Sequence, residues 1–83
     1  MALDPAWLND GTSLSREWKC KNFRAALAYV NAVGTIAEEQ RHHPDITFGW
    51  GHVKIRITTH DAGNRLTEKD LRLAEAIDRV PAP

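Results

Sequence analysis

The chain has 83 residues, a single cysteine, and 11 basic side chains that balance 11 acidic ones. Its length predicts one small domain whose core gains stability from self-association, and the lone Cys20 excludes an internal disulfide and favours a reducing compartment. The charge balance lacks the basic excess that nucleic-acid binding requires, and no apolar run approaches the roughly 20 residues of a membrane span. We therefore expect a soluble cytoplasmic protein whose partner is a small molecule or another protein, not nucleic acid or a membrane.

The first two organised segments are a strand and a helix. Residues 14–20 alternate apolar and polar side chains, with Arg16 on the apolar side, and predict a half-buried strand. Residues 22–41 carry apolar side chains at intervals of three and four and predict a helix with Asn22 as its N-cap. The predicted inner face of this helix comprises Phe23, Ala26, Leu27, Val30, Val33, Gly34 and Ala37.

A proline ends this helix and places two adjacent histidines at its C-terminus. Pro44 disfavours helical geometry at the residue before it, so the helix should end near Arg41 or His42. His42 and His43 are therefore expected at the C-terminal end of the helix.

Residues 52–58 form the clearest strand in the sequence, because apolar and polar residues alternate along their whole length. The apolar face of this strand comprises Val53, Ile55 and Ile57. Residues 45–50 can form its hairpin partner, with a turn or a bulge at Gly49 and Gly51.

The last periodic segment, residues 66–80, predicts a second helix. Thr67 serves as the N-cap, and Asp70 three residues later completes a variant of the capping box. The predicted inner face comprises Leu71, Leu73, Ala74, Ile77 and Val80.

The order strand, helix, strand, strand, helix with short connections predicts an α+β fold. We expect a single domain over residues 1–83, in which a four-stranded antiparallel sheet carries two long helices packed on one face. Open sheet edges and a small core predict that copies of the chain associate. About the first dozen residues and the final Pro-Ala-Pro are expected to be loosely held.

The histidines and the acids near them suit proton transfer. Glu38 precedes His42 by four residues, so a shared helix face would let its carboxylate hold the imidazole and favour the protonated form. Unpaired carbonyls at the helix end favour the same form, and an imidazolium can act as a general acid near neutral pH. His60 follows the last strand, with Asp61 and Asp70 near in sequence to orient it, and a hairpin that folds back would bring it toward the other two histidines.

Other roles for these residues stay open. Two adjacent histidines after a helix can be solvated loop residues, and Asp70 caps a helix whether or not it takes part in chemistry. Trp50 favours hairpin or core packing over a ligand platform, and the basic stripe of Lys54 and Arg56 favours a solvated or subunit-facing surface. Zinc binding is a further alternative, although neighbouring side chains diverge and no second cysteine accompanies them. Its ligands would be His42, His43, His52 and His60.

Together these residues resemble the signature of the pterin-4a-carbinolamine dehydratases. That signature is a glutamate, three residues, His-His-Pro, an aromatic about six residues on, a histidine after nine more, and an aspartate beyond it. The matching residues are Glu38, His42, His43, Pro44, Trp50, His60 and Asp70. The similarity covers roughly residues 14–80.

This resemblance implies dehydration of a 4a-hydroxytetrahydropterin, such as 4a-hydroxytetrahydrobiopterin, to the quinonoid dihydropterin, with no metal or other cofactor. It implies that His42 and His60 act as general acid and base, and that His43 chiefly holds the substrate. The other implied site positions are, as supports, Pro44, Trp50 and Asp70, and, as substrate contacts, Glu38, Thr58, Thr59 and Asp61. Family members are expected to form homodimers or homotetramers.

A non-catalytic role is the alternative, because dehydratase-like proteins also act as binding modules. The animal enzyme doubles as a dimerisation cofactor of a transcription factor, and dehydratase-like proteins of autotrophic bacteria assist Rubisco assembly in carboxysomes. That alternative implies a protein client such as Rubisco and a carboxysome-associated location. The intact histidine motif favours the enzyme.

The chain departs from the family pattern at positions outside the acid and base. Asn64 and Arg65 stand where the family usually has a glycine pair before Leu-Thr. Arg41 precedes the histidines, and Cys20 replaces an aromatic residue that is common in the first strand. We expect these differences to alter the pocket rim or the contacts with partners.

Overall fold

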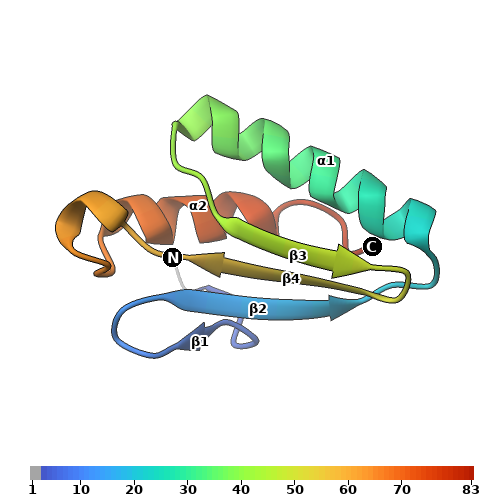
Figure 1. The fold of residues 1–83 in the computed structure, drawn as a ribbon, viewed down its shortest axis with the longest axis horizontal. Helices are drawn as coiled ribbons and strands as arrows, with labels where there is room; N and C mark the ends of the chain where they lie inside the picture. The colour runs from blue at the N-terminus through green and yellow to red at the C-terminus, as the bar shows by residue number, and fades with distance from the viewer. Residues whose placement is uncertain (1–2) are drawn as a thin grey trace.

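A four-stranded antiparallel sheet forms one layer of the fold (Figure 1). The structure, a computed structural model, describes residues 3–83. The strands lie in the order β1-β2-β4-β3 and comprise β1 (Leu8–Asn9), β2 (Leu14–Lys19), β3 (Asp45–Gly49) and β4 (His52–Ile57). The last three confirm the expected strands to within one residue. β1 is too short for an apolar pattern to reveal.

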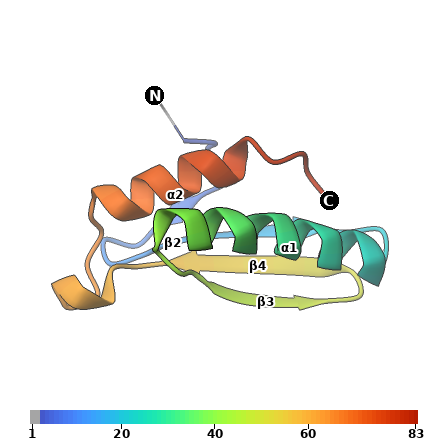
Figure 2. The same ribbon diagram turned by 90° about the horizontal axis from the view of Figure 1, so that it is seen from above.

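Two helices form the second layer and cover one face of the sheet (Figure 2). α1 spans Phe23–Gln40, α2 spans Glu68–Asp78, and the two helices contact each other. The α+β fold expected from the sequence is confirmed. No helix within residues 3–83 has both the length and the apolar content that a bilayer crossing requires.

Both expected N-caps form. The Asn22 side chain accepts a hydrogen bond from the Ala25 N–H at 2.8 Å. At the start of α2, Thr67 and Asp70 form a reciprocal capping box. Such caps satisfy N–H groups that a helix start leaves without partners, and each is worth about 1 kcal/mol. The capping box therefore determines where α2 begins and holds Asp70 in its first turn.

α1 ends at Gln40, and Arg41 after it adopts the left-handed conformation with a φ of 52°. The Arg41 N–H donates to the Glu38 carbonyl at 3.2 Å, and the His42 N–H donates to the Ala37 carbonyl at 3.1 Å. This pair of bonds is the Schellman arrangement, which closes a helix and turns the chain away from its axis. The side chain of His42 therefore no longer follows the helical spacing.

The core lies between the sheet and the helices. The β4 face that was expected to be apolar is fully buried, because β4 is flanked by β2 and β3 and covered by the helices. On α1 the expected inner face is wrong at Phe23 and Leu27, which are 47% and 41% exposed. The buried residues of α1 are Ala26, Tyr29, Val33 and Ala37. Leu27 lies about 100° around the helix from Ala26, so it points away from the core.

A similar correction applies to α2. Leu71, expected to face inward, is 46% exposed. The buried residues of α2 are Asp70, Leu73, Ala74 and Ile77. Asp70 thus faces the core, whereas the apolar pattern had predicted that its neighbour Leu71 would.

The N-terminal segment is fixed where the structure describes it. Trp7 is 7% exposed, and its indole N–H donates to Asp78 Oδ1 at 2.7 Å. The same carboxylate accepts hydrogen bonds from Arg16 Nη1 at 3.0 Å and from the Asp4 backbone N–H at 3.1 Å. The expectation of a loosely held start is therefore wrong at Asp4 and Trp7, because a buried tryptophan and a shared carboxylate anchor them to the end of α2. Residues 1–2, which the same expectation covered, lie outside the described residues.

Replacing Asp78 with alanine should lower the free energy of unfolding by about 2 kcal/mol, because it removes the acceptor of hydrogen bonds from Trp7 and the charged Arg16. Urea unfolding followed by tryptophan fluorescence measures the change. Arg72→Ala on the same helix is the matched control, since Arg72 makes an exposed pair with Glu68 at 4.0 Å that is worth less than about 0.5 kcal/mol. Equally small effects of the two substitutions would contradict the anchoring role of Asp78.

Candidate active site

Three segments meet at one end of the molecule and enclose a small depression. They are the C-terminal end of α1, the segment that follows β4, and the first turn of α2, which lie together at the left of Figure 1. The segment after β4 contains a short 3-10 helix, η1 (His60–Ala62). The depression has a volume of about 170 Å³, and its lining residues are Arg41, His42, His43, Thr58, Thr59, His60, Asp61 and Lys69. The structure thus brings the distant His60 to the adjacent histidine pair.

A buried carboxylate holds His42. Asp70 has no exposed surface, and its Oδ1 lies 2.6 Å from His42 Nε2. Its Oδ2 accepts hydrogen bonds from the Thr59 hydroxyl at 2.7 Å and from the Thr67 backbone N–H at 2.8 Å. Both carboxylate oxygens are thus occupied. The ring of His42 is fixed through Nε2, which leaves Nδ1 as the nitrogen that Asp70 does not engage.

The surroundings of Asp70 favour its ionised form. Burial by itself raises the pKa of this carboxyl group, but the hydrogen bond from His42, the bonds from Thr67 and Thr59, and the charge of His42 outweigh it. The pKa therefore lies below its ordinary value of 3.8. A buried carboxylate that stays ionised provides a negative charge directly beside an imidazole.

Glu38 contacts His43 rather than His42. Its Oε2 is within hydrogen-bond distance of His43 Nε2, and both side chains are largely exposed. The expectation that Glu38 holds His42 is therefore wrong. The left-handed conformation of Arg41 turns the chain off the helix axis. The spacing of four residues therefore does not place the side chain of His42 beside that of Glu38.

His60 is held by a residue that the sequence marked only as a departure from the family pattern. Its Nδ1 lies 2.8 Å from Oδ1 of Asn64. Asp70, expected near His60, binds His42 instead, and Asp61 lines the depression without a hydrogen bond to His60 among the described residues. His60 itself is exposed, as the first residue of η1.

The two threonines before His60 use their hydroxyls inside the protein. Thr58 Oγ1 donates to the Thr12 carbonyl at 2.6 Å, and Thr59 Oγ1 donates to Asp70. Both threonines are buried, yet they line the depression. Pro44 follows the histidines and directly precedes β3, so it directs the chain into the sheet edge.

Two further candidates lie at the opposite end of the hairpin. Trp50 is in the turn between β3 and β4 and is 68% exposed, so it does not pack in the core. It is also not among the residues that line the depression of His42, His43 and His60. His52 begins β4, whereas His60 follows its end, and six residues of strand span roughly 20 Å. Within the described residues, no three His, Cys, Asp or Glu side chains gather as metal binding requires.

Three residues of this site had no role assigned from the sequence: Arg41 and Asn64 were noted only as departures from the family pattern, and Lys69 was not singled out. Arg41 and Lys69 line the depression as cations, and Asn64 binds His60. Lys69 could have been found from its place beside Asp70 in the first turn of the predicted helix. The contact of Asn64 with His60 could have been predicted from their spacing of four residues, had a helical turn been expected there.

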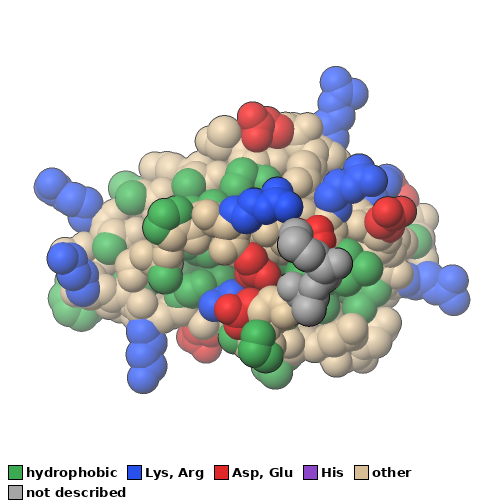
Figure 3. Space-filling view, turned by 180° about the vertical axis from the view of Figure 1, so that it is seen from behind, with side chains coloured by type: hydrophobic (Ala, Val, Ile, Leu, Met, Phe, Trp, Pro, Cys, Tyr) green, Lys and Arg blue, Asp and Glu red, His purple; other side chains and the backbone are tan. Residues whose placement is uncertain are grey.

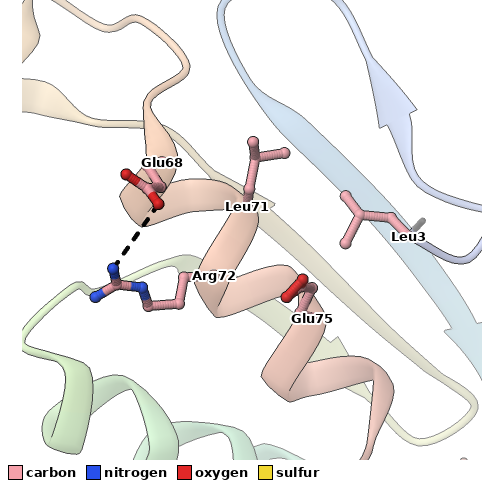
Figure 4. Close-up of a pocket in the computed structure, with 5 residues that line it drawn as sticks. All are labelled: Leu3, Glu68, Leu71, Arg72 and Glu75. Atoms are coloured by element: carbon pink, nitrogen blue, oxygen red, sulfur yellow. Dashed lines mark ion pairs between the residues drawn. The ribbon is translucent and has the colours of Figure 1, made fainter. Parts of the chain in front are cut away.

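A second depression, of about 240 Å³, lies on the exposed side of α2 (Figure 4). Its lining residues are Leu3, Glu68, Leu71, Arg72 and Glu75. None of them is a histidine, and their one ion pair is the exposed contact between Glu68 and Arg72. The view from behind in Figure 3 likewise shows charged side chains among hydrophobic ones and no histidine. The three histidines that line the first depression are therefore at the end of the fold and not on this face.

The sequence is similar to proteins that share one description. Residues 1–80 match the family model for pterin 4 alpha carbinolamine dehydratase. A protein of Thermomicrobium roseum with the provisional name pterin-4-alpha-carbinolamine dehydratase is 48% identical over 73 residues, which cover 88% of this chain and 77% of that protein. A protein of Natronomonas pharaonis with the same provisional name is 41% identical over 78 residues, which cover 94% of this chain and 84% of that protein.

Solved structures share the fold. A transcriptional coactivator/pterin dehydratase from Brucella melitensis superposes with a TM-score of 0.79 at 27% identity, over 90% of this chain and 80% of that one. A pterin dehydratase-like protein identified as a RuBisCO assembly factor in the alpha-carboxysome superposes with a TM-score of 0.69, over 94% of this chain and 87% of that one. The identity with the second is 19%, so that likeness concerns the fold alone.

Proposed function

Because the chain belongs to the pterin-4-alpha-carbinolamine dehydratase family, we propose that it dehydrates a 4a-hydroxytetrahydropterin to the quinonoid dihydropterin. The observation that carries the proposal is the pairing of His42 with the buried Asp70 in a depression that His60 also lines. The pair supplies an imidazole bonded to a carboxylate, and His60 supplies an imidazole whose hydrogen-bond partner is a neutral amide. These are the groups that a proton donor and a proton acceptor require.

The proposed reaction removes one water molecule from the substrate. The C4a–O bond breaks with both of its electrons on oxygen, and a proton from an acid lets the oxygen leave as water. The lone pair of N5 forms the new C4a=N5 double bond, and a base takes the N5 proton. One imidazolium and one neutral imidazole therefore balance the step, and the pterin neither gains nor loses electrons overall.

His42 is the proton donor in this proposal. The carboxylate of Asp70 lies within hydrogen-bond distance of His42 Nε2, where it can accept a hydrogen bond from the protonated ring. Since Nε2 is bound to Asp70, the proton is delivered from Nδ1. The substrate would lie with its 4a-hydroxyl against that nitrogen.

His60 is the proton acceptor. Its hydrogen-bond partner in the structure is the neutral amide of Asn64 rather than a carboxylate. The exposure of His60 lets it release the N5 proton to water after each turnover. The two histidines therefore differ in the chemistry of their partners, and this difference supports their opposite roles.

His43 and Asp61 hold the substrate in this proposal. Both line the depression and are exposed at its rim. The carboxylate of Asp61 can accept hydrogen bonds from the amino group and the N3–H of a pterin, and His43 can bind its carbonyl edge. Glu38, expected as a substrate contact, would then act through His43 by fixing the orientation of its ring.

The test is a direct assay of dehydration. The carbinolamine is generated by oxidation of a tetrahydropterin, and its ultraviolet decay is followed with the purified protein and with buffer alone. Faster decay with the protein supports the proposal, and decay equal to that in buffer refutes it. In the latter case the non-catalytic alternative is tested by co-elution of the protein with Rubisco subunits.

Self-association also stays a prediction. β1 and β3 form the two edges of the sheet, and the outer backbone groups of β3 have no strand partner within residues 3–83. Pairing of such an edge with a second copy would satisfy these groups. We expect a homodimer or a homotetramer in sedimentation at micromolar concentration, and a monomer there would contradict the prediction.

A further inference from the structure

We propose that Asn64 is a positioning residue that keeps His60 in the tautomer with its proton on Nδ1, and thereby presents Nε2 to the substrate as the proton acceptor. The inference rests on the proposed function for the role of His60, and its structural part stands on the contact itself. Oδ1 of Asn64 lies 2.8 Å from Nδ1 of His60. An amide oxygen only accepts, so Nδ1 must carry the hydrogen, and in the neutral ring Nε2 then has the free lone pair.

The backbone holds Asn64 where this contact can form. Gly63 and Asn64 both adopt left-handed conformations, with φ values of 76° and 59°. Asparagine tolerates this conformation better than most residues, because its short polar side chain can bond locally. Two such residues in succession turn the chain sharply after η1, so that the side chain at position 64 returns to the ring of His60.

Backbone hydrogen bonds to Thr59 secure the same turn. The Thr59 carbonyl accepts from the Asn64 N–H at 3.1 Å, and the Thr59 N–H donates to the Arg65 carbonyl at 3.1 Å. Thr59 also donates its hydroxyl to Asp70, which holds His42. One buried residue therefore anchors the partners of both histidines, which couples the positions of the proton donor and the proton acceptor.

The experiment compares three variants with the wild type. Asn64→Gly keeps the left-handed backbone and removes the amide. Asn64→Asp keeps an acceptor of the same shape and adds a charge. Arg65→Ala is the matched control, because it changes the adjacent side chain and leaves the backbone bonds to Thr59 in place.

The first measurement is the tautomer of His60, read from the ¹⁵N chemical shifts of its ring nitrogens by NMR at a pH where the ring is neutral. We expect the Nδ1–H form in the wild type, in Asn64→Asp and in Arg65→Ala, and a shift toward the Nε2–H form in Asn64→Gly. An Nε2–H form in the wild type, or an unchanged tautomer in Asn64→Gly, overturns the proposal.

The second measurement is the pH profile of carbinolamine dehydration. Asn64→Gly should lower kcat by about 10-fold with little change in KM, the lower end of the loss seen when a metal-bound histidine loses the partner that orients it. Asn64→Asp should move the optimum to higher pH, because the added carboxylate stabilises the protonated ring. A rate in Asn64→Gly equal to that of the wild type overturns the catalytic part. If neither the wild type nor any variant is active but the tautomer of His60 still depends on Asn64, the positioning of His60 by Asn64 is supported and the proposed function fails.

Discussion

Replacing His42 or His60 with alanine is expected to lower the rate of carbinolamine dehydration by about 100- to 10,000-fold, the usual contribution of a general acid or base. Both histidines line the depression. Each substitution removes one of the two groups proposed to transfer a proton, and would leave the substrate without a donor at the 4a-oxygen or an acceptor at N5. The rate is measured as kcat from the ultraviolet decay of the carbinolamine.

Two other histidines provide the controls. His43→Ala should mainly raise KM, because His43 is proposed to hold the substrate rather than to transfer a proton. His52→Ala should leave the rate unchanged, because His52 begins β4 at the far end of the hairpin. If His52→Ala and His42→Ala slow the reaction equally, the loss reflects the fold rather than the chemistry, and the assignment of His42 fails.

The wild-type rate should also depend on pH in a bell shape. The donor must be protonated and the acceptor must be neutral in the same molecule, so activity falls on both sides of an optimum. Because the two rings act on one substrate, the two apparent pKa values of this profile describe the pair and not either histidine alone. A rate that rises monotonically across the neutral range would contradict the two-histidine mechanism.

Replacing Asp70 with asparagine is expected to lower the free energy of unfolding by roughly 2 to 3 kcal/mol near neutral pH. The same substitution is expected to slow carbinolamine dehydration. The carboxylate is fully buried and accepts hydrogen bonds from Thr59 and Thr67, and an amide cannot accept all the bonds that two carboxylate oxygens accept. His42 would also lose its charged hydrogen-bond partner. Urea unfolding and the dehydration assay measure the two effects.

The pH dependence of this effect has a definite sign. Because the pKa of Asp70 in the folded protein lies below 3.8, its ionised form stabilises the fold above that pH, and the contribution is lost as the pH falls through the lower folded value. The stability difference between wild type and Asp70→Asn should therefore shrink from about pH 5 downward. Glu68→Gln, an exposed neighbour in the same helical turn, is the control and should change stability little. If the difference in free energy of unfolding between wild type and Asp70→Asn stays constant down to about pH 2, the conclusion that Asp70 is ionised in the folded protein is contradicted.

Local patterns in the sequence account for most of the fold. The alternation of Val53, Ile55 and Ile57 predicts β4, and Asn22 and Thr67 predict where the helices begin, because strand alternation and capping depend on residues a few positions apart. The spacing of the motif residues between Glu38 and Asp70 likewise indicates the family without knowledge of any contact. The anchoring of Trp7 to Asp78 lay beyond these patterns, because the two residues are 71 positions apart.

The sequence by itself determined the α+β fold, the helix start that carries Asp70, and the set of histidines from which a proton-transfer site could be built. Only the tertiary structure decided which partner each histidine meets. Spacing along a helix assigned Glu38 to His42, but the left-handed turn at Arg41 ends that spacing, and the packing of α2 beside α1 brings Asp70 to His42 from 28 positions away. The physical reason is that spacing predicts contacts only while the backbone keeps one regular geometry. Beyond a helix end, the partner of a side chain depends on how whole elements pack.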